Sequence, residues 1–304
     1  MMSNTQHVVL GGTGVIGRET TAALSARHLD VLAVSRSGAS SASGTSRAVD
    51  LRDRAAVRQV LADAQVAYLT VGVAYTLAAW RTEWPVILRN TIEGCLASGS
   101  HLIYFDNVYA YGAAAQPMTE SSPIEPCSKK GQVRASLLRM LDAAARESGL
   151  SYTIARSADF YGPGATTSVF NTFVLDRISA GREPLWMFDA AQPHSMTYTP
   201  DIGRALAVLG TQPHAWGRTW HLPTAEPLTG EEYMTLASGS PSSKTMSAMT
   251  MRIGALFNRG AREALEMAYQ NTRPYLFDST LFGRTFGIGP TPYEEALRSL
   301  VPAR

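Results

Sequence analysis

Glycines near the start of the chain follow an apolar run with a spacing that suits phosphate binding. His7-Val8-Val9-Leu10 leads directly into Gly11-Gly12-Thr13-Gly14-Val15-Ile16-Gly17, and a helix-like segment follows. Gly11 would allow a tight turn, Gly14 would let a pyrophosphate approach the backbone, and Gly17 would let the helix pack on the strand. The free N–H groups and the positive end of the helix dipole would face the anion. A plain β-turn is the alternative. The predicted dinucleotide-binding residues here are Gly11, Thr13, Gly14, Val15, Ile16 and Gly17.

The end of the second strand-like run indicates which dinucleotide is bound. The run ends Val34-Ser35-Arg36-Ser37, without a carboxylate. Enzymes that use NAD usually carry an acidic residue here, which binds the ribose hydroxyls. A guanidinium flanked by hydroxyl groups suits a 2′-phosphate instead. Ser35 and Arg36 therefore favour NADP (NADPH) over NAD, with a surface arginine as the alternative.

Strand-like and helix-like segments alternate through the first half of the chain. This alternation predicts an α/β fold with a doubly wound parallel sheet. The predicted strands are 8–10, 31–34, 47–49, 66–71, 101–105 and 151–155, and the predicted helices are 18–26, 54–62, 85–97 and 132–148. The second half is less regular, with helices at 170–180 and 200–209, a strand at 220–223 and a basic amphipathic helix that runs on to about residue 269. We expect a dinucleotide-binding domain over 1–157, with later returns near 190–223, and a smaller, mainly substrate-binding domain over 158–304.

Composition narrows the class of protein. Among 304 residues, 45% are hydrophobic and 17% are charged, which is typical of a globular protein. The net charge of +2 gives no reason to expect nucleic acid or a membrane as a partner. We find no signal-like segment and no apolar run near the roughly 20 residues of a membrane span, so we expect a cytoplasmic protein. Cys95 and Cys127 are the two cysteines and lack metal-ligand spacing, so no metal site is expected.

Several motifs together resemble the extended short-chain dehydrogenase/reductase superfamily, the group of NAD-dependent epimerases and dehydratases. The segment 10–17 resembles the family's TGxxGxxG loop, with Leu10 in place of the usual threonine. Segments 90–94, 104–112 and 156–164 are similar to the family's later motifs, and the tail at 275–292 also resembles its C-terminal end. The resemblance implies a Rossmann fold and a small-molecule substrate. It also implies a possible homodimer through the helices at 85–97 and 132–148.

The resemblance fails where the family carries out proton transfer. Its members carry a Tyr-x-x-x-Lys pair after the fifth strand and a serine or threonine at the end of that strand. In this register Lys130 replaces the tyrosine, Arg134 replaces the lysine and Asn107 replaces the hydroxyl residue. Lys130 could give a proton or stabilise a developing alkoxide. Arg134 could hold the ribose next to the nicotinamide, and Asn107 could orient a carbonyl. The alternative for Lys130 and Arg134 is a basic helix face turned to water.

Further candidates follow from the same resemblance and from the edge of the sheet. Tyr109 follows the fifth strand at the carboxyl edge, where ligands bind in such folds, and could donate a proton. Phe160 could cover the nicotinamide. The other predicted cofactor contacts are Asp50 and Leu51 at the adenine, and Val71 and Gly72 at the end of the fourth strand.

These observations predict an atypical NADP-dependent reductase of a carbonyl or a conjugated double bond in a small organic molecule. Two alternatives remain. The first is an epimerase, dehydratase or cyclase without net use of cofactor. The second is a non-catalytic protein that senses NADP, because all three positions of the proton-transfer set have changed together.

Overall fold

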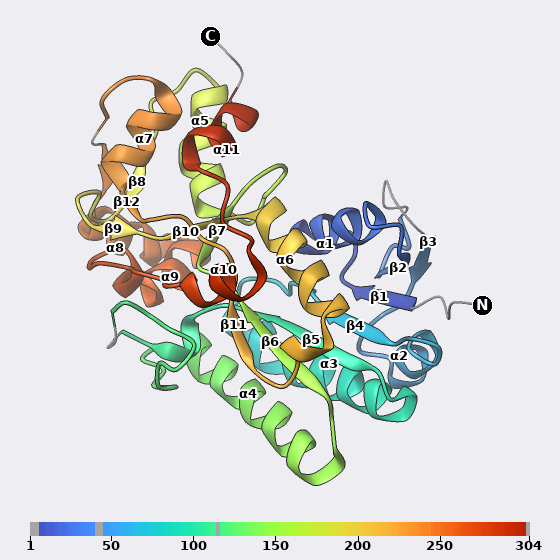
Figure 1. The fold of residues 1–304 in the computed structure, drawn as a ribbon. Coiled ribbons are helices and arrows are strands. Elements are labelled where there is room, and N and C mark those ends of the chain that lie inside the picture. Colours follow the sequence, from blue (N-terminus) through green and yellow to red (C-terminus); the bar gives the residue numbers. More distant parts are fainter. Residues whose placement is uncertain (1–5, 40–44, 114–115, 243, 302–304) are drawn as a thin grey trace. The chain divides into compact units, whose positions relative to one another are not determined.

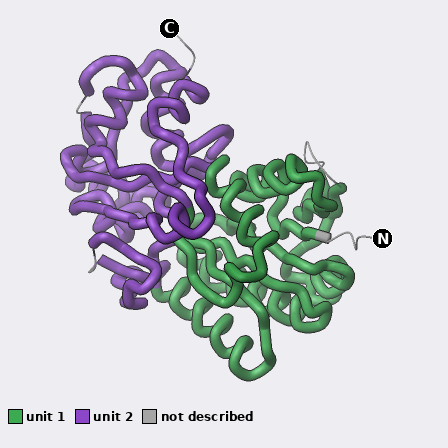
Figure 2. The backbone as a smooth tube through the Cα atoms, viewed as in Figure 1, with its two compact units in different colours: residues 1–106, 132–156, 200–222 green, residues 107–131, 157–199, 223–304 purple. Residues whose placement is uncertain are grey.

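The computed structural model describes residues 6–39, 45–113, 116–242 and 244–301. The chain divides into two compact units, and each unit is assembled from three separate stretches (Figure 2). Unit 1 comprises residues 1–106, 132–156 and 200–222, and unit 2 comprises residues 107–131, 157–199 and 223–304. Within the described part of the chain, no helix is both long enough and apolar enough to cross a membrane.

Unit 1 contains one seven-stranded sheet in which every neighbouring pair is parallel. The strand order is β11-β6-β5-β4-β1-β2-β3. The chain thus builds outward from β1 in one direction and then from β4 in the other, and the predicted doubly wound parallel sheet is confirmed (Figure 1). The strands are β1 (Gln6–Leu10), β2 (Asp30–Ser35), β3 (Thr45–Ala48), β4 (Val66–Leu69), β5 (His101–Asp106), β6 (Tyr152–Arg156) and β11 (Thr219–His221).

Helices cover both faces of this sheet, which explains why its central strands are almost continuously apolar. Val8, Val9 and Leu10 of β1 are fully buried, as is most of β4. Helices α1 and α6 lie on one face, and α2, α3 and α4 lie on the other (Figure 1). Their bounds are α1 (Val15–Ser25), α2 (Arg54–Val60), α3 (Leu77–Ser98), α4 (Lys129–Ser148) and α6 (Thr199–Thr211), and a 3-10 turn, η3 (Pro213–Ala215), follows α6.

Helix α3 begins eight residues before the predicted start at Pro85, so that prediction is wrong. The side chain of Thr76 caps the helix by accepting a hydrogen bond from the N–H of Ala79 at 3.2 Å. Pro85 therefore lies inside the helix, although proline usually occupies a first turn. The two additional turns carry Trp80 and Trp84, whose buried rings pack in unit 1.

Unit 2 has small sheets and short helices around an aromatic core. The strands pair as β7 with β10, β8 with β13, and β9 with β12. Tyr161, Phe170, Trp186, Tyr233 and Tyr293 are buried together in the core. The strands are β7 (Asp159–Tyr161), β8 (Trp186–Met187), β9 (Pro193–His194), β10 (Met196–Tyr198), β12 (Leu228–Thr229) and β13 (Thr245–Met246). The helices are η1 (Tyr109–Tyr111), η2 (Asn171–Leu175), α5 (Asp176–Ser179), α7 (Gly230–Ser238), α8 (Ala248–Phe257), α9 (Arg259–Glu266), η4 (Ala268–Gln270), α10 (Thr280–Phe286) and α11 (Tyr293–Leu300).

The amphipathic segment that follows β13 forms two helices instead of the single helix predicted to run to about residue 269. Asn258 separates α8 from α9 with an extended backbone conformation, φ −124° and ψ 120°. Its side chain accepts a hydrogen bond from the N–H of Ala261 at 3.2 Å and so caps α9. Asparagine is a strong N-cap residue, and this local preference overrides the continuous apolar pattern.

Two buried histidines in the sheet of unit 1 predict loss of stability in acid. Burial lowers the pKa of His7 to about 4 and that of His101 to about 3. The unfolded chain, in which histidine has a pKa of about 6.5, therefore takes up protons first as the pH falls. We expect the contribution of these two histidines to the free energy of unfolding to be constant above about pH 7 and to fall from about pH 6.5 down to about pH 3.

Urea denaturation at a series of pH values measures this effect. A His101→Gln variant, which removes one titrating group, should lose less stability between pH 7 and pH 5 than the unchanged protein. Equal urea midpoints for the unchanged protein at pH 7.5 and pH 4.5 would contradict the prediction.

Candidate functional site

The glycine-rich turn joins β1 to α1 in a conformation that other residues could not adopt. Gly11 has φ +102°, and a Cβ there would lie 2.7 Å from the backbone of Val71. A Cβ on Gly17 would lie 2.1 Å from the carbonyl oxygen of Gly11. The N–H groups of Gly11 and Gly12 both donate to the carbonyl oxygen of Val34, at 2.8 and 2.9 Å. The turn is thus held against the end of β2, with α1 packed directly on it.

The N-terminal end of α1 is exposed and suited to an anion. Gly14 is the N-cap residue, no side chain caps the helix, and its first turn carries no acidic residue. The first N–H groups of a helix have no acceptors within the helix, and here they belong to Val15, Ile16 and Gly17. A negatively charged group at this point would gain hydrogen bonds and a favourable interaction with the helix dipole.

A cavity of about 310 Å³ in unit 1 opens beside this turn. It lies at the carboxyl ends of the strands, where β1 and β4 mark the reversal of strand order, the usual place for a nucleotide in an open α/β sheet. The predicted cofactor residues in its wall are Gly11, Thr13, Gly14, Ser35, Arg36, Asp50, Leu51, Val71 and Gly72. The structure thus brings most of the predicted cofactor residues together around one space.

The same wall contains charged residues that the sequence analysis missed, notably Arg52 and Glu83. The Nη2 of Arg52 donates to Asp50 at 2.6 Å and its Nε donates at 3.0 Å. These hydrogen bonds lower the pKa of Asp50 to about 2, and the charge of Arg36 acts in the same direction. The carboxylate of Asp50 is therefore paired with Arg52. Arg52 follows Asp50 by two residues, and this spacing was a usable signal in the sequence.

Arg134 lies in an enclosed polar cluster of unit 1. Its Nη1 donates to the hydroxyl oxygen of Tyr104 at 2.7 Å and lies 3.5 Å from Oδ1 of Asp106. Its guanidinium carbon also lies over two indole rings, 4.8 Å from the centre of Trp80 and 4.2 Å from that of Trp84. With 8% of the side chain exposed, the alternative of a water-facing Arg134 is wrong. Arg156 donates to the other oxygen of Asp106 at 3.1 Å.

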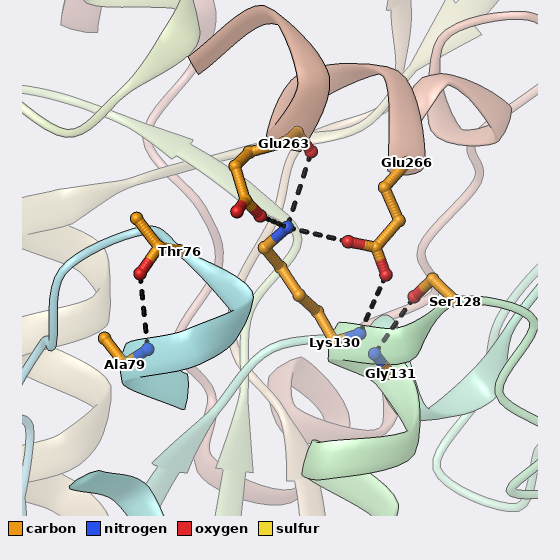
Figure 3. Close-up of polar contacts among 7 residues, drawn as sticks. All are labelled: Thr76, Ala79, Ser128, Lys130, Gly131, Glu263 and Glu266. Carbon is orange, nitrogen blue, oxygen red and sulfur yellow. Dashed lines mark hydrogen bonds and ion pairs between the residues drawn. The ribbon is translucent and has the colours of Figure 1, made fainter. Parts of the chain in front are cut away.

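Lys130 is fully buried in unit 2. Its Nζ donates to Oε2 of Glu266 at 2.8 Å and to Oε2 of Glu263 (Figure 3). The other oxygen of Glu266 accepts a hydrogen bond from the backbone N–H of Lys130 at 3.0 Å. The start of α4 is thereby joined to α9 through one ammonium and two carboxylates. The water-facing alternative for Lys130 is wrong because its exposed fraction is 0%.

The remaining predicted site residues also belong to unit 2. The side chain of Asn107 accepts a hydrogen bond from the backbone N–H of Tyr109 at 3.1 Å. Tyr109 opens the 3-10 turn η1 and is half-buried, and Phe160 is half-buried in β7. Asn107 therefore fixes the backbone that carries the Tyr109 phenol. Among the residues that the structure describes, no cluster of three or more His, Cys, Asp or Glu could hold a metal ion.

A parallel doubly wound sheet with a glycine turn at its switch point defines a Rossmann-type protein. The sequence model of the NAD dependent epimerase/dehydratase family matches residues 7–220. The chain belongs to this family, and the resemblance found in the sequence is confirmed.

One relative and two solved structures are similar to this chain. The dTDP-4-dehydrorhamnose reductase of Streptomyces griseus is 27% identical over 217 residues, which cover 67% of this chain and 64% of that protein. The UDP-glucose 4-epimerase of Thermotoga maritima, solved with UDP-glucose, superposes with a TM-score of 0.78, 18% identity and 97% coverage of both chains. The UDP-N-acetylglucosamine 4-epimerase of Bacillus cereus gives a TM-score of 0.77 at 14% identity, over 97% of this chain and 95% of that chain. These two structures establish the likeness of fold alone.

Proposed function

We propose that the protein is an NADP-dependent reductase that acts on a carbonyl or a conjugated double bond of a small molecule, with a keto sugar carried on a nucleotide as the first substrate class to test. The observation that carries the proposal is the cavity beside the glycine turn, in whose wall Arg36 and Arg52 both lie. The likeness to a dTDP-4-dehydrorhamnose reductase supports both the reaction type and the substrate class.

The preference for NADP rests on the charges at the adenosine end of this cavity. β2 ends at Ser35 and is followed by Arg36, so no carboxylate stands where NAD enzymes bind the ribose. The nearby Asp50 is engaged by Arg52. A 2′-phosphate would gain a charge-assisted hydrogen bond from Arg36 that the ribose hydroxyl of NAD cannot match.

The reduction needs a hydride and a proton. NADPH, when bound, supplies the hydride to the carbonyl carbon. We assign the proton to the phenol of Tyr109 or to the ammonium of Lys130, which donates to the developing alkoxide oxygen. Tyr109 is the stronger candidate, because the ammonium of Lys130 already donates to Glu263 and Glu266. Asn107 orients the backbone of Tyr109.

An Arg36→Ala variant tests cofactor choice and turnover together. Loss of one charge-assisted hydrogen bond should raise the KM for NADPH by roughly 10- to 100-fold and leave the KM for NADH nearly unchanged. The measurement is the initial rate of cofactor oxidation with 4-keto nucleotide sugars, ketones and enones. An Arg58→Ala variant, which changes an exposed arginine on α2, serves as the matched control.

Two results would contradict the proposal. Equal KM values for NADPH and NADH in the unchanged protein would remove the NADP preference. Conversion of a sugar nucleotide with no net oxidation of NADPH would identify an epimerase, dehydratase or cyclase instead of a reductase.

A protein that senses NADP without catalysis is the second candidate. The buried ammonium of Lys130 favours this candidate. Lys130 stands at the position of the family's tyrosine, and its ammonium already donates hydrogen bonds to two carboxylates. Such a protein would bind NADPH tightly in calorimetry and oxidise none of it with any substrate in the panel. A Tyr109→Phe variant would then keep the full biological effect.

A further inference from the structure

The outer face of α8 in unit 2 exposes an apolar stripe. The exposed fractions are 64% for Met249, 56% for Ile253, 74% for Leu256 and 88% for Phe257. Positions i, i+4, i+7 and i+8 lie along one side of a helix, so these side chains form one continuous stripe. Single exposed apolar residues are common on protein surfaces, whereas a contiguous patch marks an interaction surface.

The opposite face of α8 is the one that attaches the helix to unit 2. Met251 and Ala255 are buried, and Met251 packs with Met187 and Phe188. The exposed stripe is therefore a second apolar face of α8, distinct from the face that packs on unit 2. Apolar residues occupy both sides of α8, and its buried side already accounts for its attachment.

The chain segment that carries the stripe holds charged residues of one sign. From Thr245 to Arg262 the sequence contains three arginines and no aspartate or glutamate. Arg252 is exposed at one edge of the stripe, and Arg262 is exposed on α9. The overall charge of +2 conceals this local excess, because acidic residues elsewhere balance it.

We propose that the apolar stripe of α8 binds the surface of an anionic lipid bilayer. Met249, Ile253, Leu256 and Phe257 enter the boundary between headgroups and acyl chains, and Arg252 and Arg262 contact lipid phosphates. The ten-residue helix α8 suits this kind of binding. A helix that lies in the plane of the membrane surface inserts its apolar side chains into the bilayer, and its backbone stays outside.

A bilayer fits these observations better than a second copy of the chain. The stripe covers on the order of a few hundred Å², below the ~800 Å² per partner of a stable interface. A symmetric pairing through α8 would also bring the arginines of one copy close to those of the other, which is unfavourable. A lipid surface needs no matching shape and supplies negative charge along the whole helix.

Flotation of the full chain with vesicles tests the proposal. We expect the protein to float with vesicles of 70% phosphatidylcholine and 30% phosphatidylglycerol, and to remain unbound with pure phosphatidylcholine. A Leu256→Asp/Phe257→Asp variant should reduce the partition coefficient by at least about tenfold. Val169→Asp, at an exposed apolar residue of unit 2 outside α8 (49% exposed), should bind like the unchanged protein.

Three results would overturn the proposal. The first is the absence of binding to anionic vesicles, and the second is an equal loss in the Val169→Asp control. The third is a dimer, seen by light scattering, that the Leu256→Asp/Phe257→Asp change dissociates, because the occupant of the stripe would then be a second copy. Circular dichroism of each variant checks that the fold is retained.

Discussion

Replacing Gly14 with aspartate is expected to abolish dinucleotide binding and to leave the fold intact. Gly14 has φ −70°, which any residue adopts, and a Cβ there would meet only the Gly11 carbonyl oxygen, at 3.2 Å. The new carboxylate would stand at the end of α1 that attracts anions, in the space proposed for the pyrophosphate. Because placing like charges together costs several kcal/mol, the affinity for NADPH should fall at least about 100-fold in calorimetry.

A Gly14→Asn variant separates the effect of charge from that of size. Asparagine has nearly the same volume as aspartate and no charge, so it should retain measurable binding when the aspartate variant has none. The urea midpoints of the two variants should match each other, because both carry a Cβ at the same 3.2 Å from the Gly11 carbonyl oxygen. Undiminished NADPH binding by Gly14→Asp would mean that the turn does not hold the pyrophosphate.

Replacing Lys130 with methionine is expected to destabilise the protein by about 3 kcal/mol, because removing one partner leaves buried charges without compensation. The change removes the ammonium that Glu263 and Glu266 share, and the two carboxylates then face each other across its place. Their exposed side-chain fractions are 14% and 20%, so water can offset only part of the loss. Chemical denaturation measures the effect.

A triple variant, Lys130→Met with Glu263→Gln and Glu266→Gln, tests the cause of that loss. It removes all three charges and should recover most of the stability that Lys130→Met loses. Rates measured on this folded variant also distinguish the two proton donors, since turnover persists if Tyr109 is the donor and is lost if Lys130 is. An unchanged urea midpoint for Lys130→Met alone would show that the ion cluster contributes nothing to stability.

Structural elements that depend on residues close together in the chain were predictable from the sequence. The strand, the glycine turn and the first helix lie within twenty residues, and each has its own local signal. The buried strands of a parallel sheet are covered on both faces, so they read as apolar runs, and these runs located most of the sheet. Asp50 and Leu51 were instead predicted from the family resemblance, as the pair that follows the third strand.

Features that depend on distant residues could not be predicted. The partners of Lys130 lie 133 and 136 residues further along the chain, and nothing near Lys130 indicates them. The helix predicted from Pro85 begins too late to include Glu83 and the two tryptophans that contact Arg134. These three residues therefore lie outside every predicted helix and strand. Pro85 suggests a helix start, but the helix begins at the threonine cap nine residues before it.

The edge strand β11 has a consequence for synthesis of the chain. β11 pairs with β6, but its residues come after the chain has passed twice through unit 2. When Arg156 has been synthesised, six of the seven strands of the sheet have been made. The outer side of β6 then has no neighbouring strand until residues 157–218 have been synthesised and β11 follows. At roughly 5–20 residues per second, this nascent sheet shows an open edge to other chains for several seconds.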